Sequence, residues 1–139
     1  MNDYPTVAPM LAYADAVKAL DWLPKAFGCE VRNKYVMDDG RIGHAELHFP
    51  GNGVVMLAEV APPYEGPKQL AANYPPAAQW YDTPYIVNGM WVQVDDVDAH
   101  FAQAKANGAE ILSEPVDEGH GKSYRTADLE GHRWMFSQR

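Results

Sequence analysis

The apolar and polar positions of this 139-residue chain follow the same order twice. LAYADAVKALDWLPKAFGCEV at 11–31 can be laid over VQVDDVDAHFAQAKANGAEIL at 92–112, with one residue of slippage. Each copy contains a short apolar run, an acidic residue, apolar positions at helical spacing, a glycine and a second apolar run. Each copy therefore predicts strand, helix and strand, and the internal repeat indicates a duplicated unit.

The ends of both predicted helices are visible in the sequence. Asp15 and Asp96 stand where an N-cap carboxylate accepts the free N–H groups of the first turn. Gly28 and Gly108 stand where a helix ends in left-handed backbone. The second helix has the cleaner apolar stripe. The first should be kinked or shortened by Pro24, which removes a hydrogen bond in its third turn.

Further strands follow each helix. Residues 34–60 contain two hairpin signals, and residues 114–138 contain two matching ones. Sliding one segment onto the other pairs Met56 with Met135. The sequence therefore predicts two βαβββ modules, residues 1–60 and 90–139, which together make one α+β domain.

Residues 61–89 connect the two modules and are rich in Pro, Tyr and Gln. The prolines argue against a regular helix or strand. Because aromatic residues such as Trp80 can pack, we expect an ordered linker or flap rather than a flexible tether. A long aromatic connection in a compact domain is often functional.

Strand alternation predicts which side chains share a face. Met56 lies on one face of its strand, and Met135 and Arg133 lie on the equivalent face of the last strand. On the strand that begins the second module, Trp91 and Gln93 should point the same way. The opposite faces should pack under the helices, with Val55, Leu57, Val92, Val94, Trp134 and Phe136 as their core residues.

His44-x-Glu46-x-His48 is the one cluster that could carry chemistry. Its three side chains share a strand face, about 6–7 Å apart along the strand. A displaced metal site and a His/Glu acid–base pair are two interpretations. The third is a solvated strand face, or a pocket wall in which Glu46 pairs with Arg125. Alternatively, Arg125 could hold a ligand carboxylate, because its guanidinium has a matching fork.

The amino-acid composition limits the classes of partner that we expect for this protein. The formal net charge is −8, and the Lys and Arg residues do not cluster, so nucleic acid is not an expected partner. An acidic surface favours neutral or cationic small molecules, or simply keeps a protein in solution. One cysteine, Cys29, excludes an intrachain disulfide. With no secretion signal and no membrane-length apolar run, we expect a cytoplasmic protein without a membrane partner.

Two stretches of the second module, VQVDDVDAHFAQAKANGAEI and YRTADLEGHRWMFSQ, resemble the vicinal oxygen chelate superfamily. This superfamily includes glyoxalase I, bleomycin-resistance proteins and extradiol dioxygenases. HAELHFPGNGVVMLAE in the first module resembles its PhnB-like and bleomycin-resistance-like branch. The resemblance implies a cup of eight strands, four from each module, with the helices outside and a cavity inside. It also implies a homodimer.

Metal-dependent members of this superfamily place four ligands in the cavity, on the first and last strand of each module. In this chain, those positions fall at or near Ala8, Met56, Gly89 (or Met90) and Met135. None suits a hard or borderline divalent ion, since thioether sulfur prefers soft metals. We therefore expect no metal and no other cofactor.

These observations favour a metal-free protein that binds a small molecule, sequestering an aromatic or cationic drug or natural product as bleomycin-resistance proteins do. The alternative is a glyoxalase- or dioxygenase-type enzyme, a lyase, isomerase or oxygenase, with His44 and Glu46 as candidate catalytic residues. The sequence leaves open whether the protein is an enzyme. The predicted ligand-binding residues are His48, Met56, Trp80, Trp91, Gln93, Arg125, Arg133 and Met135.

Overall fold

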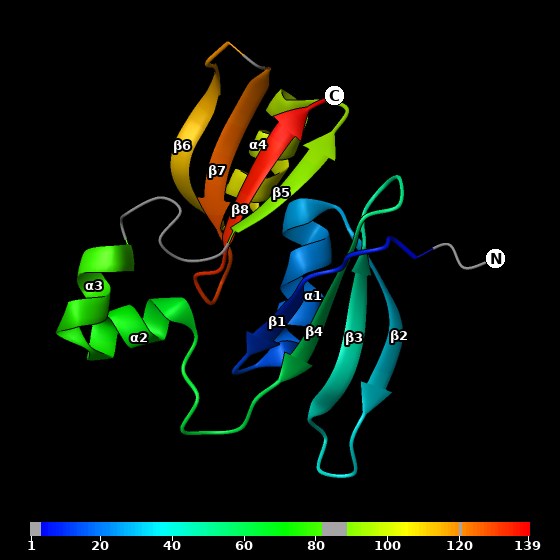
Figure 1. The fold of residues 1–139 in the computed structure, drawn as a ribbon, viewed down its shortest axis with the longest axis vertical. Coiled ribbons are helices and arrows are strands. Elements are labelled where there is room, and N and C mark those ends of the chain that lie inside the picture. Colours follow the sequence, from blue (N-terminus) through cyan, green and yellow to red (C-terminus); the bar gives the residue numbers. More distant parts are fainter. Residues whose placement is uncertain (1–3, 82–88, 120) are drawn as a thin grey trace. The chain divides into compact units, whose positions relative to one another are not determined.

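A computed structural model of the protein describes residues 4–81, 89–119 and 121–139. The chain divides into two compact units, Met1–Tyr64 and Glu65–Arg139. Each unit contains one βαβββ module with a four-stranded mixed sheet (Figure 1). The predicted duplication and the α+β class are confirmed.

The first module consists of β1 (Met10–Tyr13), α1 (Ala16–Phe27), β2 (Glu30–Val36), β3 (Ile42–His48) and β4 (Val54–Glu59). Its sheet order is β1-β4-β3-β2. β1 pairs with β4 in parallel, whereas the other pairs are antiparallel. The last strand of the module therefore lies inside the sheet and β2 forms one edge.

The second module repeats this arrangement. It consists of β5 (Gly89–Val94), α4 (Val97–Ala106), β6 (Glu110–Asp117), β7 (Lys122–Ala127) and β8 (Arg133–Gln138). Its sheet order is β5-β8-β7-β6, with β5 and β8 parallel. Met135 on β8 thus holds the position that Met56 holds on β4.

The predicted helix ends are confirmed. The Asp15 side chain accepts a hydrogen bond from the Lys18 backbone N–H at 3.0 Å. Asp96 does the same for Ala99, also at 3.0 Å. Gly28 caps α1 with a φ of 74°, and Gly108 follows α4 with a φ of 85°.

α1 corrects two predictions. It continues through Pro24 to Phe27, so the proline does not shorten it. It is also the helix with the wider buried stripe, since α4 buries only Val97 and Ala104. Burial of one apolar face outweighs the single hydrogen bond that Pro24 removes. The buried residues of α1 are Ala16, Ala19, Leu23, Ala26 and Phe27.

The strand faces divide as predicted along β4 and β8. Leu57 and Phe136 are almost fully buried on the side that packs against the helices, together with Val55 and Trp134. The Trp134 indole donates a hydrogen bond to the buried carboxylate of Asp128 at 3.0 Å. Among the described residues, no helix is both long and apolar enough to cross a membrane.

The expectation that the linker lacks regular structure is wrong for residues 67–81. These form two short helices, α2 (Pro67–Asn73) and α3 (Pro75–Tyr81). Their prolines stand in the first turn, where the missing N–H has no intrahelical partner to lose. Residues 82–88 of the predicted linker lie outside the described residues.

α2 packs on the turn between β7 and β8. The Lys68 backbone N–H donates to the Glu130 carbonyl at 2.9 Å. Gly131 has a φ of +92°, and a Cβ there would lie 2.6 Å from the Lys68 nitrogen. The close approach of α2 therefore depends on a glycine in this turn.

We expect Gly131→Ala to lower the free energy of unfolding by more than Gly108→Ala. Both residues have left-handed backbone, so each alanine carries a strain of about 1–2 kcal/mol. A Cβ at Gly108 would meet nothing within 4 Å, whereas one at Gly131 would collide with Lys68. Urea unfolding of both variants measures the difference, and equal losses would contradict the packing of α2 on this turn.

Candidate functional site

Each sheet has one face that packs against α1 or α4, and we call the opposite face the helix-free face (Figure 1). Met56 and Met135 occupy equivalent positions on these two faces. Met10 pairs with Met56 across β1 and β4. Trp91 pairs with Met135 across β5 and β8. Met10 is 74% exposed and Trp91 60% exposed, so both faces carry accessible apolar side chains.

The four positions where the family resemblance implies metal ligands carry residues that do not fit a divalent metal. Ala8 lies just before β1, and Gly89 begins β5 beside Arg133. Across the parallel strands the two methionines are paired with Met10 and Trp91, and neither supplies oxygen or imidazole nitrogen. Across the antiparallel strands Met56 is paired with Glu46 and Met135 with Arg125. Among the described residues, no three His, Cys, Asp or Glu side chains form a group that could hold a metal ion.

Glu46 is the centre of a polar cluster on the first module's helix-free face. The residue is only 4% exposed. Its Oε1 accepts hydrogen bonds from Tyr4 at 2.9 Å, Asn33 at 2.8 Å and His48 at 2.8 Å. Its Oε2 lies 3.1 Å from the Tyr4 hydroxyl and 3.4 Å from His44 Nε2. These five residues are the Glu46 cluster, and the three predicted members are brought together.

Sequence reasoning missed Tyr4 and Asn33. Asn33 lies at an irregularity in the pairing of β2 with β3, and its φ is 52°. Asparagine adopts this left-handed backbone more readily than most residues. Tyr4 reaches Glu46 from 42 residues away in sequence. The only sign in the sequence was an asparagine within a predicted strand, and this did not reveal the contact between Asn33 and Glu46.

The hydrogen bonds keep Glu46 ionised. Burial alone would raise the pKa of its carboxyl group, but hydrogen bonds from His48, Asn33, Tyr4 and His44 together lower that pKa to about 2. The hydrogen bond to Glu46 in turn raises the pKa of Tyr4. A carboxylate with so low a pKa is a weak base, so Glu46 is suited to orient its histidines rather than to remove a proton.

The two histidines differ in accessibility. His48 Nδ1 lies 3.4 Å from Arg32 Nη1, and a guanidinium only donates, so Nδ1 accepts and Nε2 carries the proton toward Glu46. The side chain of His44 is 39% exposed, compared with 17% for His48. His44 is therefore the member of the pair that a solute can reach.

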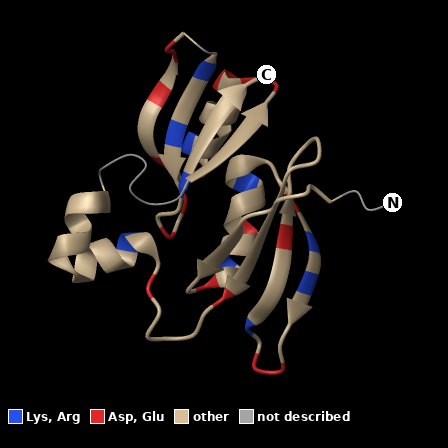
Figure 2. Ribbon diagram, viewed as in Figure 1, with Lys and Arg blue, Asp and Glu red and all other residues tan. Residues whose placement is uncertain are grey.

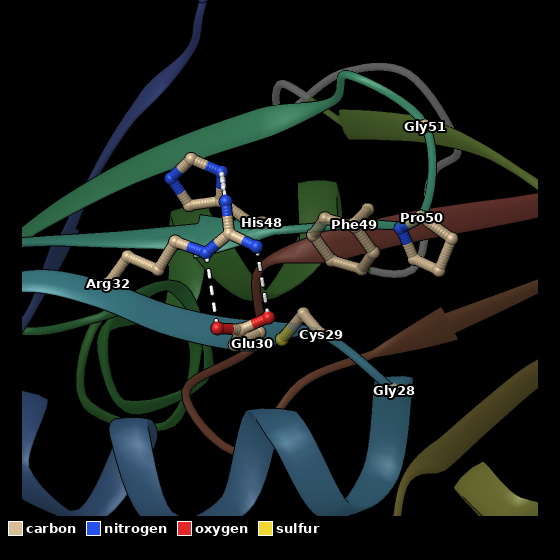
Figure 3. Close-up of a pocket in the computed structure, with 8 residues that line it drawn as sticks. All are labelled: Gly28, Cys29, Glu30, Arg32, His48, Phe49, Pro50 and Gly51. Carbon is tan, nitrogen blue, oxygen red and sulfur yellow. Dashed lines mark hydrogen bonds and ion pairs between the residues drawn. The ribbon is translucent and has the colours of Figure 1, made fainter.

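A pocket of about 390 Å³ opens beside His48, where β2 begins and β3 ends. Figure 3 shows Arg32 between His48 and Glu30. Arg32 makes two hydrogen bonds of 3.1 Å to Glu30, so this guanidinium is already engaged. Burial raises the pKa of the Cys29 thiol to about 12, which makes it an unreactive part of the wall. The remaining lining residues are Gly28, Phe49, Pro50 and Gly51.

The other predicted site residues lie in the second unit. Arg125 on β7 is in register with Met135, so the two side chains share the helix-free face. Gln93 and Trp80 are exposed, on β5 and α3 respectively. The Arg133 guanidinium lies 4.9 Å from the centre of the Tyr81 ring, a contact that sequence reasoning missed. A pairing of Glu46 with Arg125 would join the two units and stays a prediction.

We expect Glu46→Gln to lower the melting temperature at neutral pH, because an amide cannot accept all the hydrogen bonds that the carboxylate accepts. The folded pKa of Glu46 is lowered from 4.5 to about 2. Its stabilising effect is therefore complete above about pH 4.5 and is lost as the pH falls toward 2. Thermal unfolding of both proteins from acid to neutral pH should show their difference shrinking through this window.

Glu118→Gln is the matched control, because Glu118 is an exposed residue just after β6. It should leave the melting temperature close to that of the wild type at every pH. Parallel pH profiles for the wild type and Glu46→Gln would contradict the ionised state of Glu46.

Comparison with known proteins agrees with this architecture. The family model described as the Glyoxalase/Bleomycin resistance protein/Dioxygenase superfamily matches residues 6–136. An uncharacterized protein of Mycobacterium tuberculosis is 31% identical over 139 residues, covering 99% of this chain and 76% of that protein. TioX from Micromonospora sp. ML1 is 30% identical with a TM-score of 0.68, covering 96% of this chain and 98% of TioX.

A fourth comparison concerns the fold alone. A variant of the fosfomycin resistance protein FosX from Listeria monocytogenes, in complex with Mn(II) and 1S,2S-dihydroxypropylphosphonic acid, is 16% identical. Its TM-score is 0.63, and the match covers 96% of this chain and 88% of FosX. With the family match across almost the entire sequence and the duplicated βαβββ modules, the chain belongs to the Glyoxalase/Bleomycin resistance protein/Dioxygenase superfamily.

Proposed function

We propose that this protein binds and sequesters an aromatic small molecule, such as a drug or natural product, without a metal ion. One observation carries this proposal: large apolar side chains stand exposed beside Met56 and Met135 on the helix-free faces. Contiguous exposed apolar surface is one mark of a ligand-binding groove.

The residue types suit such a ligand. Trp91 provides a flat π face, and Met135 beside it is flexible and polarizable. A sulfur–aromatic contact contributes about 0.3–1.5 kcal/mol. Because the methionine side chain is flexible, Met135 and Trp91 together can bind rings of differing shape. The net charge of −8 favours a neutral or cationic ligand over an anionic one at long range.

The comparisons support a role in handling small molecules. The family description includes bleomycin resistance proteins, and one protein of similar fold is a fosfomycin resistance protein. The homodimer and the cytoplasmic location that the sequence suggested stay predictions.

We expect planar aromatic drugs, such as the cationic acridine proflavine, to quench the tryptophan fluorescence of this protein saturably. Trp91→Phe should remove most of the quenching, and Met135→Ala should weaken binding about two- to tenfold, from the sulfur–aromatic contribution. Trp22→Phe is the control, because Trp22 lies on α1 with its ring 5.2 Å from Phe27. A lack of saturable quenching across the drug panel would overturn the proposal.

Acid–base catalysis by His44 is a second candidate function. Its Nε2 lies 3.4 Å from the ionised Glu46, and its side chain is the more exposed of the two histidines. A carboxylate that orients an accessible imidazole is a common arrangement for a general base. His44 would then remove a proton from a substrate carbon next to a carbonyl group, as a lyase or isomerase does.

Proton exchange tests this second candidate without knowledge of the product. Carbonyl compounds with an acidic C–H are incubated in D₂O with chelator-treated protein, and deuterium incorporation is followed by NMR. We expect exchange with the wild type and its loss in His44→Ala. Exchange that persists in His44→Ala would count against His44 as a base. A lack of exchange by the wild type with every compound tested would do the same.

A further inference from the structure

Arg133 is placed to meet a ligand on the helix-free face of the second module. It begins β8 two residues before Met135, and alternate residues of a strand share a face. On the neighbouring strand, its partner in the sheet is Gly89. Since glycine has no side chain, the neighbouring strand places none beside Arg133 at that position.

Among the described residues, one edge of this guanidinium has no hydrogen-bond partner. Within the described part of the chain, Arg133 Nε and Nη2 are buried nitrogen atoms that donate to no acceptor. These two atoms form one side of the guanidinium, where two parallel N–H groups match the two oxygens of a carboxylate. Buried charged donors without acceptors are rare in folded proteins, because their lost hydration is not replaced.

The guanidinium is also held in place. The Tyr81 ring lies 4.9 Å from Arg133 Cζ, which is within the range of a cation–π contact. The Tyr81 hydroxyl donates to Glu110 at 3.1 Å, so that carboxylate is engaged by the tyrosine. Asp128 accepts from its own turn and from Trp134. The neighbouring carboxylates of Glu110 and Asp128 therefore accept hydrogen bonds from other donors.

The surroundings add an aromatic surface and a second positive charge. Trp91 lies two residues along β5 from Gly89, about 8 Å diagonally from Arg133 by strand geometry. Arg125 shares the same face through its register with Met135. Figure 2 shows basic residues on β7 next to acidic residues on β6. Lys122 of β7 pairs with Asp98 of α4 at 2.7 Å, so Arg125 is the cation that β7 adds to the helix-free face.

We propose that the ligand of this protein is an aromatic carboxylate. Its carboxylate accepts two hydrogen bonds from the Nε and Nη2 edge of Arg133, and its ring lies against Trp91 and Met135. This inference rests on the proposed binding function and specifies the class of ligand. The acidic net charge alone would disfavour an anionic ligand at long range. The preference for a carboxylate therefore comes from Arg133 at contact distance.

Isothermal titration with three matched ligands tests the inference. 2-Naphthoate, neutral 2-naphthamide and cationic 2-naphthylmethylamine share a ring system and differ in charge. We expect the wild type to bind naphthoate at least tenfold more tightly than the amide. Arg133→Gln should weaken naphthoate binding to the level of the amide.

Two further variants separate the guanidinium edge from charge and from folding. Arg133→Lys keeps the charge but lacks the two-pronged edge, so it should lose most of the preference for naphthoate. Arg139→Gln removes an exposed cation that is paired with Asp95, and it should leave the preference intact. A preference that survives in Arg133→Lys would overturn the assignment to the guanidinium edge.

The ligand series separates this inference from the function on which it rests. Equal binding of naphthoate and the amide by the wild type, or tighter binding of the amine, would overturn the carboxylate assignment and leave the aromatic binding function standing. Failure of all three ligands to bind would overturn both.

Discussion

Burial of one face of β4 and of β8 against the helices determines the rest of this molecule. Side chains alternate strictly along a strand, so placing Leu57 and Phe136 in the core fixes Met56 and Met135 on the opposite faces. A slip of one residue would expose the large core side chains to water and bury the methionines. The composition of both helix-free faces is therefore a consequence of core packing.

The same constraint produces different chemistry in the two modules. Leu47 enters the core from β3, so Glu46 lies on the opposite face, where Tyr4, Asn33 and two histidines donate to its carboxylate. At the equivalent position of β7 stands Arg125, opposite Met135. One module thus surrounds a carboxylate with donors, and the other carries guanidinium groups. The two modules share their sheet topology and a buried helix side, whereas their helix-free faces differ.

Membership of the superfamily explains the fold of this chain but not its site. A protein of similar fold was crystallised with Mn(II), whereas here methionines stand at two positions where the family resemblance implies metal ligands. Thioether sulfur is a poor ligand for a hard divalent ion, and it offers flexible, polarizable apolar surface instead. A shared fold therefore carries little information about the reaction or the ligand, which depend on a few side chains.

Local rules were enough to predict the duplicated modules, the helix caps and the faces of β3, β4, β5 and β8, because capping and alternation depend on nearby residues. They failed where contacts between residues far apart in sequence, or an unusual backbone conformation, determine the structure. α1 continues past Pro24 because its face is buried, and Asn33 turns toward Glu46 through a left-handed φ. Tyr81 on α3 reaches Arg133 on β8 from a distant part of the chain, and α2 packs on the β7–β8 turn. The sequence by itself determined which side chains face away from the core. Only the tertiary structure decided which of their polar groups are satisfied, because those partners come from remote segments.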